Sequence, residues 1–273
     1  MSERLRRGGL GLVTLAFVVV AVGPVYWAVS TAFKSRADAF AYPPAFTFSP
    51  SLDSYKVLFD RFAFGDPIVN SLIICTLSTG IAVVVGSLAA YALSRFRVPG
   101  GRVLMFVLLS VRMFPAIALA LPLYLLLTKN GLFDSRLGVI AAYTAFSIPI
   151  VVWMMRSFFE DVPMALDEAA LMDGHSRLSV LTRVVAPLST PGLVATATFV
   201  VILLWNEFLI ATVLTSSKAV TIPVAVTGLY TDRGIEWDKM AAAGSLAILP
   251  VVFFTLLIHK YLVRGLTFGA VKG

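Results

Sequence analysis

The sequence contains few charged residues and few residues suited to redox or metal chemistry. Only 14% of its 273 residues are charged, and it has one cysteine and two histidines. The single cysteine, Cys75, excludes an internal disulfide, and we expect it to be a small packing residue. Soluble domains are roughly 45–50% apolar, whereas this chain is 59% apolar with a mean hydropathy of +0.90. The composition therefore excludes an ordinary water-soluble domain.

Several catalytic motifs are also absent. The sequence has no Gly-Lys dipeptide and so cannot form the phosphate-binding loop G-x-x-x-x-G-K-[ST]. It has neither G-x-S-x-G nor H-E-x-x-H, and its histidines, His175 and His259, lie near predicted helix ends. His175 is most simply a polar turn residue. We therefore expect no catalytic residue, no metal site and no cofactor bound to this chain, which argues against an intramembrane enzyme.

What the sequence does contain is long uncharged runs. A membrane-spanning helix needs about 20 apolar residues, and five runs reach at least 19 residues without a charge, while a sixth is interrupted once, by Arg112. They predict an all-α integral membrane protein, with one transmembrane domain over residues 1–273. The six predicted spans are about 10–32, 68–93, 103–127, 137–156, 190–214 and 241–262.

The distribution of Lys and Arg predicts the orientation. With the N-terminus inside, twelve of the 22 basic residues lie in cytoplasmic segments and nine lie outside. The densest cluster, Arg95, Arg97 and Arg102, is cytoplasmic in this arrangement. Both termini and a loop of about residues 157–189 are then cytoplasmic. The net charge of +7 matches basic flanks at an anionic leaflet and requires no nucleic acid.

Two features within the predicted spans indicate packing and bending. Gly86 and Ala90 form a small-xxx-small pair, which lets two helices approach closely. Prolines in the third and fourth spans mark kinks, either beside a pathway or of purely structural origin; they are Pro115, Pro122 and Pro149.

The cytoplasmic loop contains an unusual acidic segment, since residues 160–173 carry five acids and no Lys or Arg. Pro163 suits the first position of a short solvent-facing helix, and Asp161 is placed to cap it. Asp167 adds negative charge near the helix start. Gly174 falls where a left-handed terminating residue belongs. From these residues alone, an ordinary surface helix and a docking helix remain equally open.

The segment "EAALMDG", followed after 12 residues by "PL", resembles the Glu-Ala-Ala motif of binding-protein-dependent ABC importer permeases. Three other segments are similar to this family in the same order: "NSLIICTLSTGIAVVVGSLAAYALSRFRVPGG", "WNEF" and "RGLTFGAVKG". The resemblance covers nearly the whole chain. It is to the sugar-type permeases, among the shorter six-span partner subunits.

This resemblance implies that the acidic helix is a coupling helix that docks on a separate ATPase subunit. By the family's pattern the docking residues are Glu168, Ala169, Ala170, Asp173 and Gly174. The implied partners are an ATPase dimer that binds ATP and Mg, a second permease in a heterodimer, and an extracytoplasmic substrate-binding protein. The implied location is a bacterial-type inner membrane. Lys272 in the C-terminal tail either reaches the ATPase or belongs to a frayed end.

Charged residues inside the spans are candidates for the translocation pathway. Arg112 lies ten residues from Arg102, roughly 15 Å deep. A charge there costs about 2.5–3.5 kcal/mol, so we expect it to face protein or water. Glu207 and Asn206 lie roughly 10 Å or more further along, so we expect no direct pairing with Arg112 and assign them to an outer gate or to the second permease. An arginine at position 112 is not implied by the family, which leaves an anionic sugar derivative open.

The alternative is an ion-coupled secondary transporter. Such proteins usually contain inverted repeats around a midplane site, and no repeat is visible between residues 1–129 and 130–273. Residues 215–240 form the predicted outer loop, which is a candidate contact for the binding protein or a simple connection.

Overall fold

The computed structural model describes the backbone of residues 2–231 and 234–268, with side chains described for residues 10–230 and 236–256. The chain divides into two compact units. One comprises Met1–Gly65 with Ala225–Pro250, and the other comprises Asp66–Val224 with Val251–Gly273. The candidate functional residues in the described side chains belong to the second unit.

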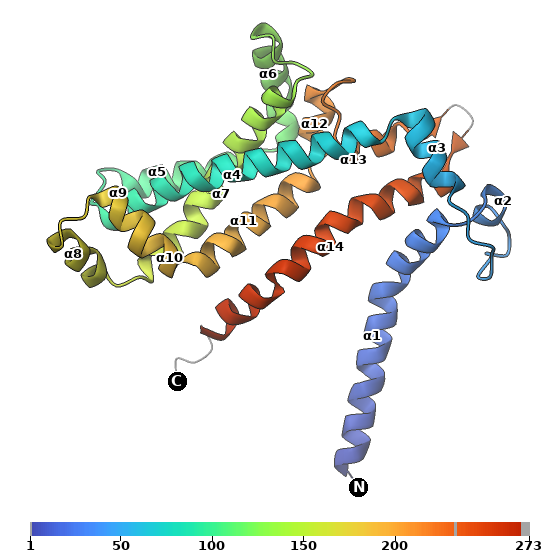
Figure 1. The fold of residues 1–273 in the computed structure, drawn as a ribbon, viewed down its shortest axis with the longest axis horizontal. Coiled ribbons are helices and arrows are strands. Elements are labelled where there is room, and N and C mark those ends of the chain that lie inside the picture. Colours follow the sequence, from blue (N-terminus) through green and yellow to red (C-terminus); the bar gives the residue numbers. More distant parts are fainter. Residues whose placement is uncertain (1, 232–233, 269–273) are drawn as a thin grey trace. The chain divides into compact units, whose positions relative to one another are not determined.

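The described elements are helical, apart from one pair of two-residue strands, which confirms the all-α class (Figure 1). The N-terminal elements are α1 (Ser2–Ala32), α2 (Arg36–Ala39) and α3 (Asp53–Phe62). They are followed by α4 (Gly65–Arg95), α5 (Gly101–Met113), α6 (Ala116–Lys129), α7 (Arg136–Glu160) and α8 (Met164–Met172). Next come α9 (Arg177–Val180), the π-helical turn η1 (Leu181–Val185), α10 (Ala186–Leu188), α11 (Thr190–Trp205) and α12 (Leu209–Leu214). The last are α13 (Ile222–Thr227), the antiparallel strands β1 (Tyr230–Thr231) and β2 (Gly234–Ile235), and α14 (Trp237–Phe268).

Four helices in the described ranges are long and apolar enough to cross a membrane by themselves: α1, α4, α7 and α14. Two further spans require bent pairs. α5 and α6 meet at 94°, and the segment Arg177–Leu188 meets α11 at 83°. The count of six spans therefore stays a prediction, which holds if each bent pair crosses once. The predicted ranges 103–127 and 190–214 do not correspond to single straight helices.

The break between α5 and α6 has a local cause at Pro115. Proline has no amide hydrogen, and it disfavours helical geometry in the residue before it. Phe114 accordingly has ψ 133°, and α6 begins only at Ala116. Pro122 and Pro149 instead lie inside helices. Of the three prolines named from the sequence, only Pro115 lies at a helix break.

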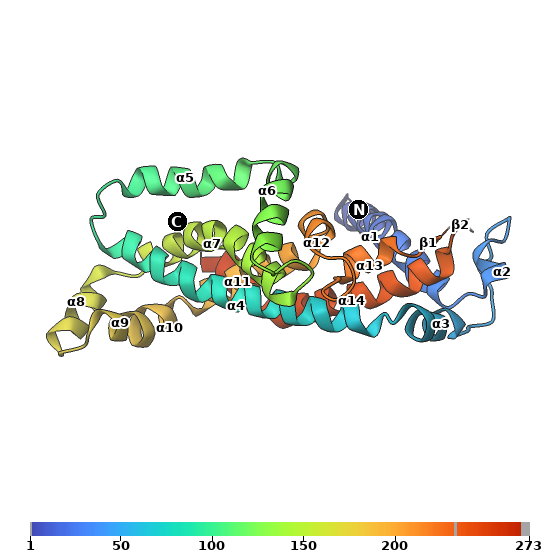
Figure 2. The ribbon, with the colours of Figure 1, turned by 90° about the horizontal axis from the view of Figure 1, so that it is seen from above.

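Two glycines allow close contacts with α7 in the second unit. A Cβ at Gly86 of α4 would lie 2.6 Å from Cγ1 of Val151, and Ala90 one turn later is fully buried. The predicted small-xxx-small packing is thereby confirmed. A Cβ at Gly192 of α11 would overlap the Phe158 ring. α7 is thus the helix against which α4 and α11 pack, and α5 also contacts it (Figure 2).

The first unit contains a buried cluster of charges around the start of α14. The ammonium group of Lys239 lies 3.2 Å from Asp238 and pairs with Glu236. The hydroxyl of Ser54 in α3 donates to Asp238 Oδ2 at 3.1 Å. These contacts fasten α3 to the N-terminal end of α14.

Candidate functional site

α8 is a nine-residue helix that begins one residue later than the sequence predicts. Pro163 precedes its first turn, with ψ 131°, and no side chain caps it. Asp161, which we expected to be the cap, ends α7 instead. The proline therefore separates α7 from α8, and the predicted helix start was wrong in this detail.

The end of α8 confirms the predicted role of Gly174 as the terminating residue. Its φ is +84°, in the left-handed region that glycine adopts without strain. The amide of Gly174 donates to Leu171 O, and that of His175 donates to Ala170 O, both at 3.1 Å. These bonds satisfy carbonyls that the helix leaves free. His175 is a polar turn residue, since its Nδ1 lies 2.9 Å from Ser179 Oγ.

The predicted docking residues do not all face the same way. Glu168, Ala169, Asp173 and Gly174 are exposed, whereas Ala170 is only 7% exposed and packs against its own chain. The two alanines of the motif are thus divided between the two faces of the helix. Large apolar side chains not selected from the sequence are exposed on the same segment: Met164, Leu166, Met172 and, in α9, Leu178. We call the exposed residues of α8 with Asp173, Gly174 and Leu178 the α8 face.

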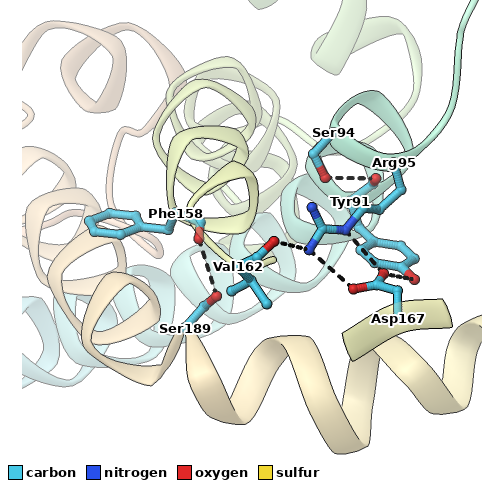
Figure 3. A network of polar contacts seen from close by, with 7 residues as sticks. All are labelled: Tyr91, Ser94, Arg95, Phe158, Val162, Asp167 and Ser189. Atoms are coloured by element: carbon cyan, nitrogen blue, oxygen red, sulfur yellow. Dashed lines mark hydrogen bonds and ion pairs between the residues drawn. The ribbon is translucent and has the colours of Figure 1, made fainter. Parts of the chain in front are cut away.

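Asp167 is buried, although the sequence predicted a solvent-facing position for it (Figure 3). Its carboxylate accepts two hydrogen bonds from Arg95, from Nε at 3.0 Å and from Nη2 at 3.2 Å. Tyr91 OH donates to the same carboxylate at 3.1 Å, and Arg95 Nη2 also donates to Val162 O at 2.9 Å. The side chains of Arg95 and Asp167 are each 2% exposed. This is a bidentate ion pair in which both charges are desolvated.

Aromatic rings pack against Tyr91, which donates to this ion pair. The Tyr91 ring lies edge-on to Phe96 at 6.3 Å and to Phe159 at 6.2 Å. The guanidinium of Arg177 in α9 lies 5.4 Å from the centre of the Phe96 ring. The C-terminal ends of α4 and α7 therefore meet α8 and α9 in one cluster. Figure 1 shows α8, α9 and α10 together at the C-terminal end of α4, far from α6 and α12.

Sequence reasoning used Arg95 only as a marker of orientation and missed its partner. One signal was available, because Asp167 and Ala170 are three residues apart and share a helix face. That face is opposite Glu168. A carboxylate on the face turned toward apolar spans needs a buried cation, and Arg95 at the end of the second predicted span was a candidate.

Arg112 and Glu207 line one cavity of about 220 Å³, together with Tyr143, Phe146 and Ser147. Arg112 Nη1 donates to Phe146 O at 3.4 Å. Glu207 Oε1 accepts from the amide of Ile210 at 2.7 Å, at the start of α12. Our depth estimate assumed two straight helices and did not anticipate a shared cavity, because α5 ends at Met113 and α11 at Trp205.

The other predicted site residues are located elsewhere. Asn206 is exposed, its Nδ2 donates to Ile202 O at 2.7 Å, and it is not among the residues that line this cavity. Lys272 lies outside the described residues. Within the described ranges, no group of three or more His, Cys, Asp or Glu residues is arranged to hold a metal ion.

A second polar centre, unforeseen from the sequence, lies at Asp134 between α6 and α7. Its carboxylate accepts from the backbone amides of four consecutive residues, Ser216, Ser217, Lys218 and Ala219, at 3.0–3.2 Å. Burial alone would raise the pKa of Asp134, but these donors outweigh it and lower the pKa to about 2. Asn70 Nδ2 donates to the carbonyls of Lys218 and Val220. The segment 216–220 is therefore tied to α4 and to the α6–α7 turn.

Residues 82–268 match the family described as binding-protein-dependent transport system inner membrane component. The chain belongs to this family. The permease is 41% identical over 258 residues to the probable ABC transporter permease protein y4oR of Sinorhizobium fredii, covering 94% of this chain and 92% of the relative. It is 38% identical to the trehalose transport system permease protein SugB of Mycobacterium tuberculosis, covering 92% of each chain.

A solved structure has the same fold along nearly the whole permease. It is a chain of a bacterial ABC transporter involved in the import of the acidic polysaccharide alginate, with a TM-score of 0.78 and 25% identity. The similarity covers 96% of this chain and 98% of that one. The resemblance noted in the sequence is confirmed, and so is the fold of an importer permease that it implied.

Proposed function

We propose that the permease forms half of the translocation pathway of an ATP-driven importer for a sugar or oligosaccharide. The substrate class is inferred from the trehalose and alginate systems to which the chain is similar. ATP and Mg are bound by a separate ATPase dimer. A second, different permease completes the pathway, and an extracytoplasmic binding protein delivers the substrate. In this arrangement both termini and α8 are cytoplasmic.

The observation that carries the proposal is the α8 face. It presents Glu168, Ala169 and Asp173 together with Met172, which is 88% exposed. A methionine with so little cover at a helix end is suited to a partner surface, since Met adapts to irregular grooves. Gly174 turns the chain away immediately afterwards. We assign this face to contact with the ATPase, and Lys272 in the tail to the same partner.

The cavity beside α7 is the proposed site of passage. Arg112 and Glu207 line it with the hydroxyl-bearing Tyr143 and Ser147, and such groups hydrogen-bond to sugar hydroxyls. Asn206 next to this cavity is assigned to the gate or to the second permease. Because Arg112 is the one cation among the described lining residues, an anionic sugar derivative is a substrate to include in any test.

The deciding experiment is the isolation of the chain from its native membrane in mild detergent, followed by mass measurement of the intact complex. We expect two copies of an ATPase and one copy of a different permease. A chain isolated alone, or as a homodimer without ATPase, would overturn the assignment and would favour the ion-coupled secondary transporter. Nothing in the family match or the fold supports that alternative at present.

A further inference from the structure

We propose that Arg95, Asp167 and Tyr91 form a rigid linkage that transmits movement of α8 to α4. The proposal rests on the proposed function, in which α8 is displaced by the ATPase. Arg95 and Asp167 are then positioning residues. They do not contact the ATPase or the substrate, but fix the angle between the helix that receives the force and a helix that crosses the membrane.

α8 contacts α9 and η1, which follow it along the chain. Its buried residues are Asp167 and Ala170, and the segment that joins it to α7 is only residues 161–163. Ala170 contributes one methyl group, which can slide along a neighbouring surface. The carboxylate of Asp167 is the side chain that joins α8 to α4 by directional hydrogen bonds.

The geometry of the ion pair fixes orientation as well as distance. Two parallel hydrogen bonds from Nε and Nη2 of Arg95 hold the carboxylate in the plane of the guanidinium, which resists rotation. Tyr91, one helical turn earlier in α4, donates to the same carboxylate. Arg95 also holds Val162 O in the segment before α8. α4, this segment and α8 are joined at one point (Figure 3).

A role in stability alone does not explain the choice of charged residues. Well-packed apolar side chains often stabilise a buried site as much as an ion pair does, because both charges must be desolvated. The ion pair supplies a defined register between two helices, which an apolar contact leaves loose. The neighbouring residues Glu168 and Ala169 lie on the exposed face, so the two functions of α8 fall on its two sides.

The test measures the rigidity of the link in the intact complex. Cys75 is buried, and in a Cys75→Ala background nitroxide labels are placed at residue 88 of α4, which is exposed, and at residue 171 of α8, which is half-buried and lies outside the α8 face. The distance distribution between them is recorded with and without Mg·ATP. In the unmutated linkage we expect one narrow distribution in both states. In Asp167→Asn and Arg95→Lys we expect it to broaden at least twofold, while ATPase co-purification is kept and ATP hydrolysis continues.

Two further variants make the result decisive. Glu160→Gln breaks the exposed ion pair with Arg156, 2.7 Å long within α7, and should leave the distribution unchanged. Arg95→Met/Asp167→Leu removes both buried charges, so it tests the linkage even if the single variants fail to accumulate. We expect it to bind the ATPase with a broadened distribution. A narrow distribution in this double variant, or in Asp167→Asn, would overturn the linkage.

Failure of the proposed function would have a different signature. If the unmutated chain co-purifies with no ATPase, the assignment as an importer subunit fails, and the linkage has no force to transmit. If the ATPase is present and the variants give the same narrow distance distribution as the unmutated chain, the linkage is wrong but the proposed function stands.

Discussion

Arg112 of α5 and Glu207, in the turn between α11 and α12, line one cavity, yet each is held by a backbone group: Arg112 by the carbonyl of Phe146 and Glu207 by the amide of Ile210. Among the described residues the guanidinium makes one long hydrogen bond of 3.4 Å, which leaves its other N–H donors available. The Glu207 carboxylate instead caps α12 at 2.7 Å. Glu207 therefore shapes the chain at the start of α12, whereas the remaining donors of Arg112 are those we propose for contact with a solute.

Replacement of Arg112 by Gln should reduce transport without disturbing assembly. The change removes the charge and the fork of donors from the cavity wall, and the Phe146 carbonyl keeps a donor from the amide. We expect uptake to fall about tenfold, which corresponds to about 1.4 kcal/mol, with ATPase co-purification unchanged. Uptake is measured in vesicles with neutral and carboxylated sugars. Arg102→Gln, at the exposed start of α5, is the control, and equal loss in both variants would contradict a role in the cavity.

Replacement of Gly174 by Asp should leave membrane insertion intact and weaken ATPase binding. A side chain at φ +84° costs about 1–2 kcal/mol, although the space around this glycine is open. The turn then shifts the end of the α8 face. The measurement is the ATPase recovered per permease. Gly131→Asp provides a matched control, because Gly131 has φ +68° and open space in another turn. Normal transport by the Gly174 variant would contradict the docking role.

Replacement of Gly86 by Val should destabilise the second unit, because its Cβ would lie 2.6 Å from Val151. Overpacking of this kind costs about 1–3 kcal/mol, and we expect a lower melting temperature in detergent. Gly80→Val in the same helix has nothing within 4 Å of the added Cβ. The two variants share the change in helix propensity, so only the contact with α7 distinguishes them. Similar melting temperatures would show that the close approach is unnecessary.

The attachment of segment 216–219 should be insensitive to pH down to mildly acidic conditions. The pKa of Asp134 falls from its ordinary value of 3.8 to about 2 in the folded chain. Its contribution to stability is therefore fully present above pH 3.8 and is lost as the pH falls through about 2. We expect hydrogen exchange of amides 216–219, corrected for intrinsic rates, to stay constant from pH 7 to pH 4. Asp134→Asn should exchange faster throughout this range.

A loosening of the loop between pH 7 and pH 4 would contradict this account. It would show that a group other than the Asp134 carboxylate controls the segment. Asp66→Asn is the control for loss of a carboxylate elsewhere in the second unit.

Local features of the site were predictable from the sequence. The left-handed conformation of Gly174 follows from a preference of the residue itself, and the helix before it follows from alanines and a flanking proline. The packing at Gly86 follows from the size of the residue. The sequence signal for each of these features lies within a few positions of the chain. The family membership was also predictable, because its motifs are short and occur in a fixed order along the sequence.

The features that depend on distant segments were not predictable. Arg95 and Asp167 meet only because α4 and α7 end side by side, and Asp134 meets residues 216–219 because the α6–α7 turn lies beside the end of α12. The cavity shared by Arg112 and Glu207 requires two helix breaks. A depth estimate based on the rise per residue of straight helices includes neither of them. The break at Pro115 had a local signal, whereas that after Trp205 had none.

That this chain is a helical membrane protein of the importer permease family could be inferred before its fold was known, because the length of hydrophobic runs and the order of motifs are properties of the linear sequence. Which face of α8 is exposed and which is buried became clear from the packing of distant segments. Adjacent residues of an α-helix point about 100° apart, and the partners that packing brings near decide which of them is buried. Asp167 is buried and Glu168 is exposed because Arg95 lies on one side of α8 and not on the other.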